Sequence, residues 1–192
     1  MSHYNILPQS VYTEGLYLLR ALRAADMSAI KDWRNAQMDV LRQKTVLTDE
    51  DQHRYYQLTV KPTFDMQQPP LVLFGYEYDG TLIGYGGLTN LDWTSLRAEV
   101  SFLVETERAK NLPQYEIDFR HFLRLLKRIA FQELGLNRLF TETYDIRPWH
   151  IRILESEGFL FEGRMRQHVK IDGRYVDSLL HGCLKEQLHV SG

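Results

Sequence analysis

Residues 71–88 read Leu-Val-Leu-Phe-Gly-Tyr-Glu-Tyr-Asp-Gly-Thr-Leu-Ile-Gly-Tyr-Gly-Gly-Leu, and this stretch decides the class of fold. Two β-rich runs flank Asp79-Gly80, a dipeptide that accepts the positive φ angles of a tight two-residue turn. The stretch therefore predicts a β-hairpin. Apolar and polar residues alternate over 97–104, which predicts a third strand and extends the hairpin into an antiparallel meander.

Segments with a helical period surround this meander. Met27, Ile30 and Trp33 are spaced by three residues, so they share one face of a helix for which Asp26 is the expected N-cap. The proline-rich stretch 61–70 is expected to be a loop. The other expected elements are a strand over 16–23, helices over 48–59, 116–134 and 149–157, a strand over 139–144, and a final hairpin over 159–184.

This order of elements predicts a mixed α/β fold. It contains a central, mostly antiparallel sheet of about seven strands and about four flanking helices. The chain has 192 residues, of which 44% are hydrophobic, and this is enough for one such core. We therefore expect a single domain over residues 1–192, with residues 1–15 as an N-terminal extension and 186–192 as a tail.

Composition excludes several classes of function. Lys and Arg number 23 against 25 Asp and Glu, so there is no basic excess and no nucleic-acid partner is expected. No apolar run approaches the roughly 20 residues of a membrane helix, so no membrane partner is expected. The single cysteine, Cys183, excludes an intramolecular disulfide and fits a reducing, cytoplasmic location. The seven histidines lack paired ligand spacing, so no metal is expected.

Four further sequence motifs follow one another along the chain. Trp33-Arg34-Asn35 ends the first helix, and 97–102 read RAEVSF. Residues 153–164 read ILESEGFLFEGR and 172–182 read DGRYVDSLLHG. These strings resemble W/F-R-N, RAEIGF, LLEKLGF-x-x-EG-x-x-R and DGRYVDVLLYG of the GNAT superfamily of acyl-CoA-dependent N-acetyltransferases. The resemblance spans about residues 16–185 and implies a GNAT-like fold.

The resemblance implies an N-acetyltransferase with acetyl-CoA as its cosubstrate. A primary amine would attack directly in a ternary complex, without a covalent enzyme intermediate. Backbone groups of Phe102, Leu103 and Val104, on the splayed strand, would bind the pantetheine and thioester. Arg147 and Trp149, at the start of the next helix, would contact the pantetheine or adenine end, although a surface Arg and a core Trp explain the same string.

The segment aligned with the phosphate-binding loop departs from the family pattern. It consists of Arg108, Ala109, Lys110, Asn111 and Leu112, followed by Pro113. Asn and Pro replace the two glycines whose backbone N–H groups bind the CoA pyrophosphate in this family. A left-handed Asn111 could still turn the loop, and the side-chain charges of Arg108 and Lys110 could compensate for the missing donor.

Acetyl transfer needs a base for the amine and an acid for the leaving thiolate. Glu99, on the strand 97–104, is the candidate base; the alternative is a strand Glu that faces solvent or pairs with an Arg. Many relatives carry an acidic Tyr where this chain has Leu154. Tyr144 and His150 are the candidate acids. The alternative for Tyr144 is a tyrosine that only packs on the core, and the alternative for His150 is a histidine at a helix start without a catalytic role.

The acceptor is expected to be a small-molecule primary amine. Arg34 and Asn35 are expected to line its pocket, on resemblance alone. The combined strings favour a nucleotide-linked amino sugar. A polyamine, bound by the acidic run 49–51, and a protein N-terminus stay open.

A non-catalytic module that senses acyl-CoA is the competing class, because the phosphate loop and the tyrosine both depart from the pattern. The final strand, with Leu179 and Leu180, is expected to be exposed. Exposed edge strands readily pair with another chain, so a homodimer is the expected assembly.

Overall fold

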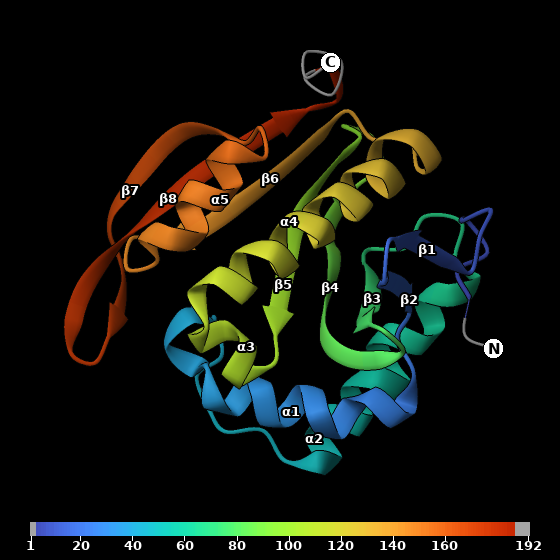
Figure 1. Cartoon of the computed structure of the whole chain (residues 1–192), viewed down its shortest axis with the longest axis horizontal. Coiled ribbons are helices and arrows are strands. Elements are labelled where there is room, and N and C mark those ends of the chain that lie inside the picture. Colours follow the sequence, from blue (N-terminus) through green and yellow to red (C-terminus); the bar gives the residue numbers. More distant parts are fainter. Residues whose placement is uncertain (1–2, 187–192) are drawn as a thin grey trace.

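The computed structural model describes residues 3–186, and within them eight strands form one sheet in the order β1-β2-β3-β4-β5-β6-β8-β7 (Figure 1). Neighbouring strands are antiparallel, except that β5 and β6 run parallel. The strands are β1 (Val11–Glu14), β2 (Tyr17–Ala21), β3 (Val72–Tyr78), β4 (Thr81–Asp92), β5 (Arg97–Val104), β6 (Arg138–Tyr144), β7 (Leu160–Ile171) and β8 (Arg174–Leu184).

Five α-helices accompany the sheet in the described part of the chain. They are α1 (Met27–Ala36), α2 (Asp49–Tyr55), α3 (Thr106–Lys110), α4 (Leu112–Arg128) and α5 (Pro148–Ser156). Short helical turns are η1 (Ala24–Asp26), η2 (Met38–Val40), η3 (Tyr56–Val60), η4 (Lys61–Asp65) and η5 (Ile129–Glu133). In Figure 1, α4 and α5 lie in front of the sheet, whereas α1 and α2 run along its lower end.

The mixed α/β fold and the meander at its centre are confirmed. The turn between β3 and β4 has φ angles of 48° at Asp79 and 75° at Gly80, as a tight two-residue hairpin requires. The third strand covers the predicted residues 97–104. Gly86, on β4, permits a close approach: a Cβ atom there would collide with the Ser101 carbonyl oxygen and with the ring of Phe122 on α4.

The sheet has one strand more than predicted. Residues 11–14 lie in the expected N-terminal extension, yet they form β1 and pair with β2, Tyr12 opposite Leu19. Both side chains are buried. Four residues at a sheet edge are too short for the alternation pattern to reveal. Residues 187–192 of the expected tail lie outside the described residues.

Two local predictions need correction. Asp26 occupies the predicted N-cap position of α1, but its side chain makes no capping hydrogen bond, because it is buried and its carboxylate accepts from the Arg20 guanidinium at 2.6 and 2.9 Å. The first half of the expected loop 61–70 is the 3₁₀ turn η4, which tolerates its proline because that residue lies in the first turn.

The long helix begins earlier than its apolar pattern indicates. Asn111 is its N-cap, and its side-chain oxygen accepts the backbone N–H of Gln114 at 3.3 Å. The helix therefore starts at Leu112 rather than Glu116. At the other end, Gly135 adopts the predicted left-handed conformation with a φ of 66°.

The final strand is not an edge of the sheet. β8 lies between β6 and β7, and Leu179 is buried. The prediction of subunit pairing through this strand is therefore wrong, because both of its backbone edges are already paired. The edge strand on this side of the sheet is β7, on which Leu160 and Phe161 are more than half exposed. A homodimer remains a prediction.

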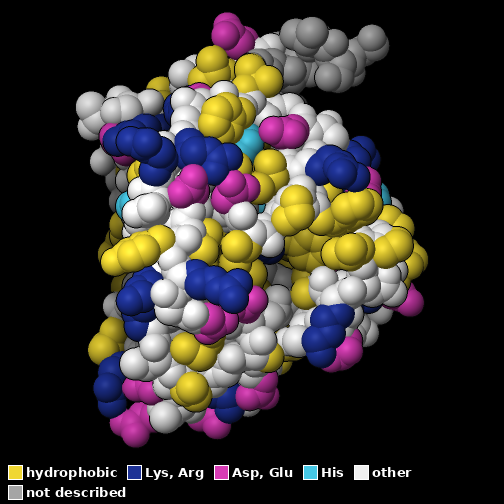
Figure 2. All heavy atoms as spheres, turned by 90° about the vertical axis from the view of Figure 1, so that its left-hand side faces the viewer, with side chains coloured by type: hydrophobic (Ala, Val, Ile, Leu, Met, Phe, Trp, Pro, Cys, Tyr) yellow, Lys and Arg dark blue, Asp and Glu magenta, His cyan; other side chains and the backbone are white. Residues whose placement is uncertain are grey.

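Among the described residues, no helix combines the length and apolar character needed to cross a bilayer. On the face shown in Figure 2, Lys and Arg side chains alternate with Asp and Glu rather than forming a patch of one sign. Residues 3–186 hold no group of three or more His, Cys, Asp or Glu side chains placed to bind a metal ion.

Candidate active site

The site lies where two parallel strands part. β5 and β6 pair only over Arg97–Glu99 and Arg138–Phe140, and beyond these residues the strands diverge. On its other side, β5 stays paired with β4 as far as Val104. The splay leaves one backbone edge of Phe102, Leu103 and Val104 without a strand partner, as the resemblance predicts, although the Val104 carbonyl accepts the side-chain amide of Gln37 at 2.9 Å.

Two cavities meet at this splay. The first has a volume of about 350 Å³ and lies between the diverging ends of β5 and β6, under the segment that follows η2. The second has a volume of about 480 Å³ and lies between η2, α3 and the starts of α4 and α5. Arg147 and His150, from the start of α5, line both cavities. Groups bound in the two cavities would therefore meet at these side chains.

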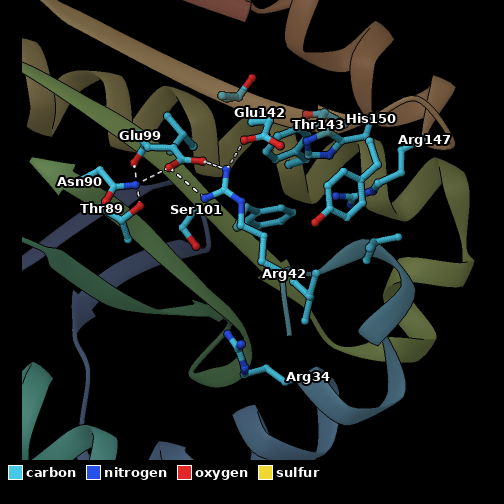
Figure 3. A pocket seen from close by; sticks show the side chains of 17 residues that line it. Arg34, Arg42, Thr89, Asn90, Glu99, Ser101, Glu142, Thr143, Arg147 and His150 are labelled. Atoms are coloured by element: carbon cyan, nitrogen blue, oxygen red, sulfur yellow. Dashed lines mark hydrogen bonds and ion pairs between the residues drawn. The ribbon is translucent and has the colours of Figure 1, made fainter. Parts of the chain in front are cut away.

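Glu99 borders the first cavity and is also paired with an arginine (Figure 3). It is only 7% exposed. Its carboxylate accepts the Asn90 side-chain amide at 2.6 Å and the Arg42 guanidinium at 2.6 and 3.2 Å. Arg42 also donates to Glu142, on β6, at 2.9 Å. Glu99 thus faces a cavity and pairs with an Arg, as one alternative expected, and its role as the base stays a prediction.

His150 is held at the junction of the cavities by Tyr115. The Tyr115 hydroxyl lies 2.7 Å from Nδ1 of His150 and accepts an N–H from Arg147 at 2.9 Å. Phe119 stacks on the imidazole with ring centroids 4.3 Å apart. Burial and the Arg147 charge hold the pKa of His150 well below its usual range. The imidazole is therefore neutral, and if Tyr115 donates to Nδ1 its proton sits on Nε2.

Tyr144 lies at the end of β6 and lines the first cavity. Its ring is 6% exposed, and burial raises the pKa of its phenol. The structure thus brings the three predicted catalytic residues, Glu99, Tyr144 and His150, to one cavity. Leu154, which replaces the tyrosine of many relatives, is fully buried in α5.

The segment aligned with the phosphate loop is helical instead. Thr106–Lys110 form α3. Asn111 has a φ of −86°, so the prediction of a left-handed Asn111 is wrong. The backbone N–H groups of Ala109 and Asn111 donate to the carbonyls of Glu105 and Glu107. Local helical hydrogen bonds thus occupy two of the donors that a phosphate loop would offer.

The two predicted compensating charges differ in their partners. Arg108 donates twice, at 2.8 Å, to the fully buried carboxylate of Asp118, and this carboxylate raises the pKa of the guanidinium. The Arg108 side chain therefore pairs with α4 and does not line the second cavity. Lys110 lines that cavity and pairs with the exposed Glu107 at 2.7 Å.

The second cavity suits a long, partly apolar ligand with an anionic end. Its apolar lining comes from Ala109, Leu112, Ile146 and Trp149, and its cations are Lys110 and Arg147. The indole N–H of Trp149 is buried without a hydrogen-bond partner, which is costly unless a ligand accepts it. These features fit CoA, whose pantetheine arm carries amides and whose nucleotide end carries phosphates.

The two residues predicted for the acceptor pocket have different positions. Arg34 lines the first cavity, where it donates to the Tyr85 hydroxyl at 2.6 Å and to the Gln43 side chain at 3.0 Å. Asn35 lies outside the lining of both cavities. It donates to the Leu47 carbonyl at 2.9 Å and accepts from Gln43 at 2.8 Å, so it holds the segment that carries Arg42.

The acidic run 49–51 lies outside both cavities as well. Asp49 pairs with Lys31 at 2.9 Å, Glu50 pairs with Arg54 at 2.6 Å, and Asp51 accepts hydrogen bonds from Thr48 at the start of α2. The prediction that this run binds a polyamine therefore has no support in its position. The acidic residues of the cavity are Glu99 and Glu142.

Sequence reasoning missed Arg42, Asn90, Tyr115 and Glu142. Arg42 lies in an irregular segment whose pattern carries no signal. Tyr115 falls just before the predicted start of its helix, so its side chain had no predicted face. Glu142 lies two residues before Tyr144 on a strand, and this spacing puts both side chains on one face. That period could have identified Glu142.

Comparison with known proteins identifies the family and similar folds. Residues 19–180 match the family described as Acetyltransferase (GNAT) domain. A Bacillus subtilis protein named "Putative ribosomal N-acetyltransferase YdaF" is 29% identical over 135 residues, which are 69% of this chain and 70% of that protein. The spermidine N-acetyltransferase SpeG of Vibrio cholerae, in complex with CoA and spermine, superposes with a TM-score of 0.77 at 19% identity, over 91% of this chain and 98% of SpeG. A dodecameric structure of that enzyme gives a TM-score of 0.76 at 19% identity, over 92% and 98%. With the family matched over most of its length, the chain belongs to the GNAT acetyltransferases.

Proposed function

We propose that the chain transfers the acetyl group of acetyl-CoA to a primary amine by direct attack, with acetyl-CoA in the second cavity and the amine in the first. The observation that carries this proposal is the shared border of the two cavities at Arg147 and His150. Two reactants that meet there need no covalent relay through the protein. Cys183 agrees with direct attack, since it is buried on β8 and burial raises the pKa of its thiol.

Acetyl-CoA supplies the thioester when it is bound. Lys110 and Arg147 would pair with its phosphates, and the indole N–H of Trp149 would donate to one of its polar groups. The free backbone edge of β5 at Phe102 and Leu103 would hold the end of the pantetheine arm. Residues of this one chain line both cavities.

The three residues of the first cavity take distinct roles in this proposal. Glu99 accepts the proton of the amine, since a buried carboxylate beside the acceptor is a suitable base. Tyr144 donates a proton to the departing sulfur, because a phenol whose pKa is raised by burial stays protonated at neutral pH. The neutral His150 directs an Nε2–H that can stabilise negative charge on the acyl oxygen, as neutral imidazoles do in other enzymes.

The acceptor is proposed to be a cationic amine. The relatives described above are named for a ribosomal substrate and for spermidine, so they give no support to the nucleotide-linked amino sugar favoured by the strings. Glu99 and Glu142 also suit a protonated amine better than a ligand that carries phosphates. A protein N-terminus and a polyamine are the two acceptors of this kind.

Two measurements test the proposed function in sequence. Isothermal titration with acetyl-CoA is expected to show binding, and a variant in which Lys110 is replaced by Ala is expected to bind more weakly. A thiol-release assay then uses spermidine, a peptide with a free N-terminal amine and a nucleotide-linked amino sugar. Release with one of the first two is expected. Absence of acetyl-CoA binding would contradict the proposal.

A sensor of acyl-CoA is the second candidate, and one observation favours it. Arg42 covers Glu99, the proposed base. A protein in which this contact persists would bind the cofactor without offering a free base. Tight binding of acetyl-CoA with no thiol release on any of the three amines would establish the sensor instead of the enzyme.

A further inference from the structure

Arg42 places a cationic nitrogen between two carboxylates in the acceptor cavity. Its Nη2 atom lies 2.6 Å from Oε1 of Glu99 and 2.9 Å from Oε2 of Glu142. The two carboxylates come from β5 and β6, the strands that diverge at the site. We infer that Glu99 and Glu142 form the subsite for the ammonium group of the acceptor, and that the Arg42 side chain fills this subsite until a cationic acceptor displaces it. This inference rests on the proposed function in taking the first cavity as the acceptor site.

The contacts of Glu99 distinguish a permanent partner from a displaceable one. Asn90 donates to Oε2 at 2.6 Å from the neighbouring strand β4. Oε1 receives its only described hydrogen bond from Arg42. When Arg42 leaves, Asn90 still orients the carboxylate, and Oε1 becomes free. The oxygen that Arg42 covers is therefore the one suited to take a proton from the amine.

The Arg42 side chain is exposed, whereas the backbone around it is anchored. Its side chain is 55% exposed, whereas that of Glu99 is 9% exposed. Its backbone belongs to the irregular segment 41–48, which Asn35 anchors through hydrogen bonds to Gln43 and Leu47. Figure 3 shows the Arg42 guanidinium between Glu99 and Glu142. An exposed arginine with several rotatable bonds can rotate into solvent without disturbing these anchors, so the subsite opens by a side-chain rotation.

The chemistry of the subsite selects the ligand. A guanidinium and an alkylammonium are both cations with several N–H donors, and the ammonium is the more compact of the two. Two carboxylates at one position favour a cation over a neutral amine, and they repel an acceptor that carries phosphate. The subsite thus captures the protonated amine, which then loses its proton to Oε1 of Glu99 and becomes the nucleophile.

Displacement has a predictable effect on affinity. The apparent affinity of an acceptor is reduced by the fraction of molecules in which the subsite is open. If Arg42 fills the subsite about nine-tenths of the time, its removal should tighten acceptor binding about tenfold. Glu142→Gln should weaken binding of the same acceptor, because one of the two carboxylates loses its charge.

The first experiment tests the subsite without catalysis. Ethylguanidinium chloride is titrated into wild type, Arg42→Ala and the double variant Arg42→Ala/Glu142→Gln at constant ionic strength, and binding is followed by NMR. We expect millimolar binding to Arg42→Ala and much weaker binding to the other two proteins. Arg54→Ala, which removes an exposed ion pair on α2, is the matched control and should behave as wild type. Equal binding to wild type and Arg42→Ala would overturn the inference.

The second experiment tests displacement by an acceptor. In the thiol-release assay with spermidine or the free N-terminal peptide, Arg42→Ala should lower KM about tenfold and leave kcat within a few-fold of wild type. An unchanged or raised KM would overturn the displacement. Arg42→Gln, which keeps most of the side-chain length, serves if the Ala variant does not fold. Acetyl-CoA titration of wild type and of each variant distinguishes a failure of this inference from a failure of the proposed function. If the proposed function is wrong, wild type itself does not bind acetyl-CoA; if only the inference is wrong, all proteins bind acetyl-CoA and the KM for the acceptor does not fall.

Discussion

The hydroxyl of Tyr115 lies 2.7 Å from Nδ1 of His150, and this contact fixes which nitrogen of the imidazole is free to act. Arg147 donates to the same hydroxyl, and when this hydroxyl donates in turn to Nδ1, His150 keeps its own proton on Nε2. The arrangement spans the starts of α4 and α5. In this tautomer the buried histidine is a neutral hydrogen-bond donor at the border of both cavities.

Tyr115→Phe should lower kcat while acetyl-CoA still binds. The change removes the donor to Nδ1 and leaves a buried acceptor without a partner, which costs roughly 1–3 kcal/mol in the orientation of the imidazole and about ten- to a hundredfold in rate. Steady-state kinetics and acetyl-CoA titration check this. Tyr175→Phe, at a largely exposed position, is the control. Unchanged kinetics in Tyr115→Phe would separate His150 from the reaction.

His150 also makes folding stability depend on pH. Its pKa is lowered in the folded protein, whereas an unfolded histidine has a pKa of about 6.5. Below that value the unfolded chain binds a proton that the folded protein does not. The stability contribution is therefore complete above about pH 6.5 and is lost as the pH falls, by roughly 1 kcal/mol at pH 5.5.

Urea unfolding at pH 5.5 and pH 7.5 measures this effect. His150→Gln should show a smaller loss of stability between the two pH values than wild type. The control is His53→Gln, because that side chain is exposed on α2. The same pH dependence in wild type and His150→Gln would show that other groups cause it.

Glu99→Gln should reduce kcat strongly and leave acetyl-CoA affinity unchanged. Glutamine keeps an oxygen for the Asn90 amide but cannot accept the amine proton, so the rate should fall by about 10²–10⁴-fold. Steady-state kinetics of wild type and variant, with acetyl-CoA titration of both, check this. The control is Glu50→Gln, on the exposed face of α2. A kcat within a few-fold of wild type would remove Glu99 from the role of base.

Local chemistry explains which parts of this protein could be predicted from sequence. Asp79-Gly80 specifies its own turn, and Gly135 and Gly158 end their helices with φ angles of 66° and 89°. Residues 11–14 and 106–110 form elements of four and five residues, too short for a period to be read. Tertiary context decides such short elements more than propensity does.

In the candidate site, too, some residues could be predicted from the sequence and others could not. Glu99, Tyr144 and His150 could be predicted as candidates from their chemistry and from their positions in the predicted strands and helix, and the structure brings them to one cavity. Their partners were not predictable, because the contact of Arg42 with Glu99 joins residues 57 positions apart and that of Tyr115 with His150 joins residues 35 apart. Charge alone does not say which of 23 basic residues meets which carboxylate.

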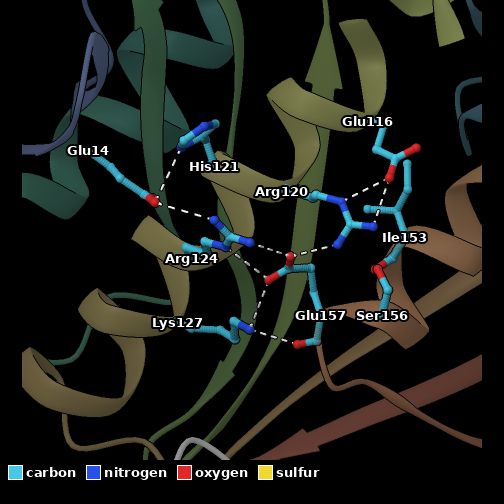
Figure 4. A network of polar contacts seen from close by, with 9 residues as sticks. All are labelled: Glu14, Glu116, Arg120, His121, Arg124, Lys127, Ile153, Ser156 and Glu157. Atoms are coloured by element: carbon cyan, nitrogen blue, oxygen red, sulfur yellow. Dashed lines mark hydrogen bonds and ion pairs between the residues drawn. The ribbon is translucent and has the colours of Figure 1, made fainter. Parts of the chain in front are cut away.

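Glu157, directly after α5, holds that helix against α4 (Figure 4). Its carboxylate is 3.0 Å from Arg120 and 3.2 Å from Arg124, and its backbone carbonyl accepts from Lys127 at 2.7 Å. Arg147 and His150 depend on this packing, because both lie at the other end of α5. Glu157 and Lys127 are both buried, so water screens the contact between these two residues little, whereas Arg120 and Arg124 are partly exposed.

Glu157→Gln should therefore lower the free energy of unfolding by roughly 2–3 kcal/mol, since the basic side chains around it lose the charge that compensates them. Urea unfolding checks this, with Glu50→Gln as the control because its ion pair is exposed and worth less than about 1 kcal/mol. At temperatures where the variant stays folded, its KM for acetyl-CoA should rise, because a displaced α5 moves Arg147 and Trp149. A variant as stable as wild type would show that apolar packing alone, and not the charge of Glu157, fixes the angle between α4 and α5.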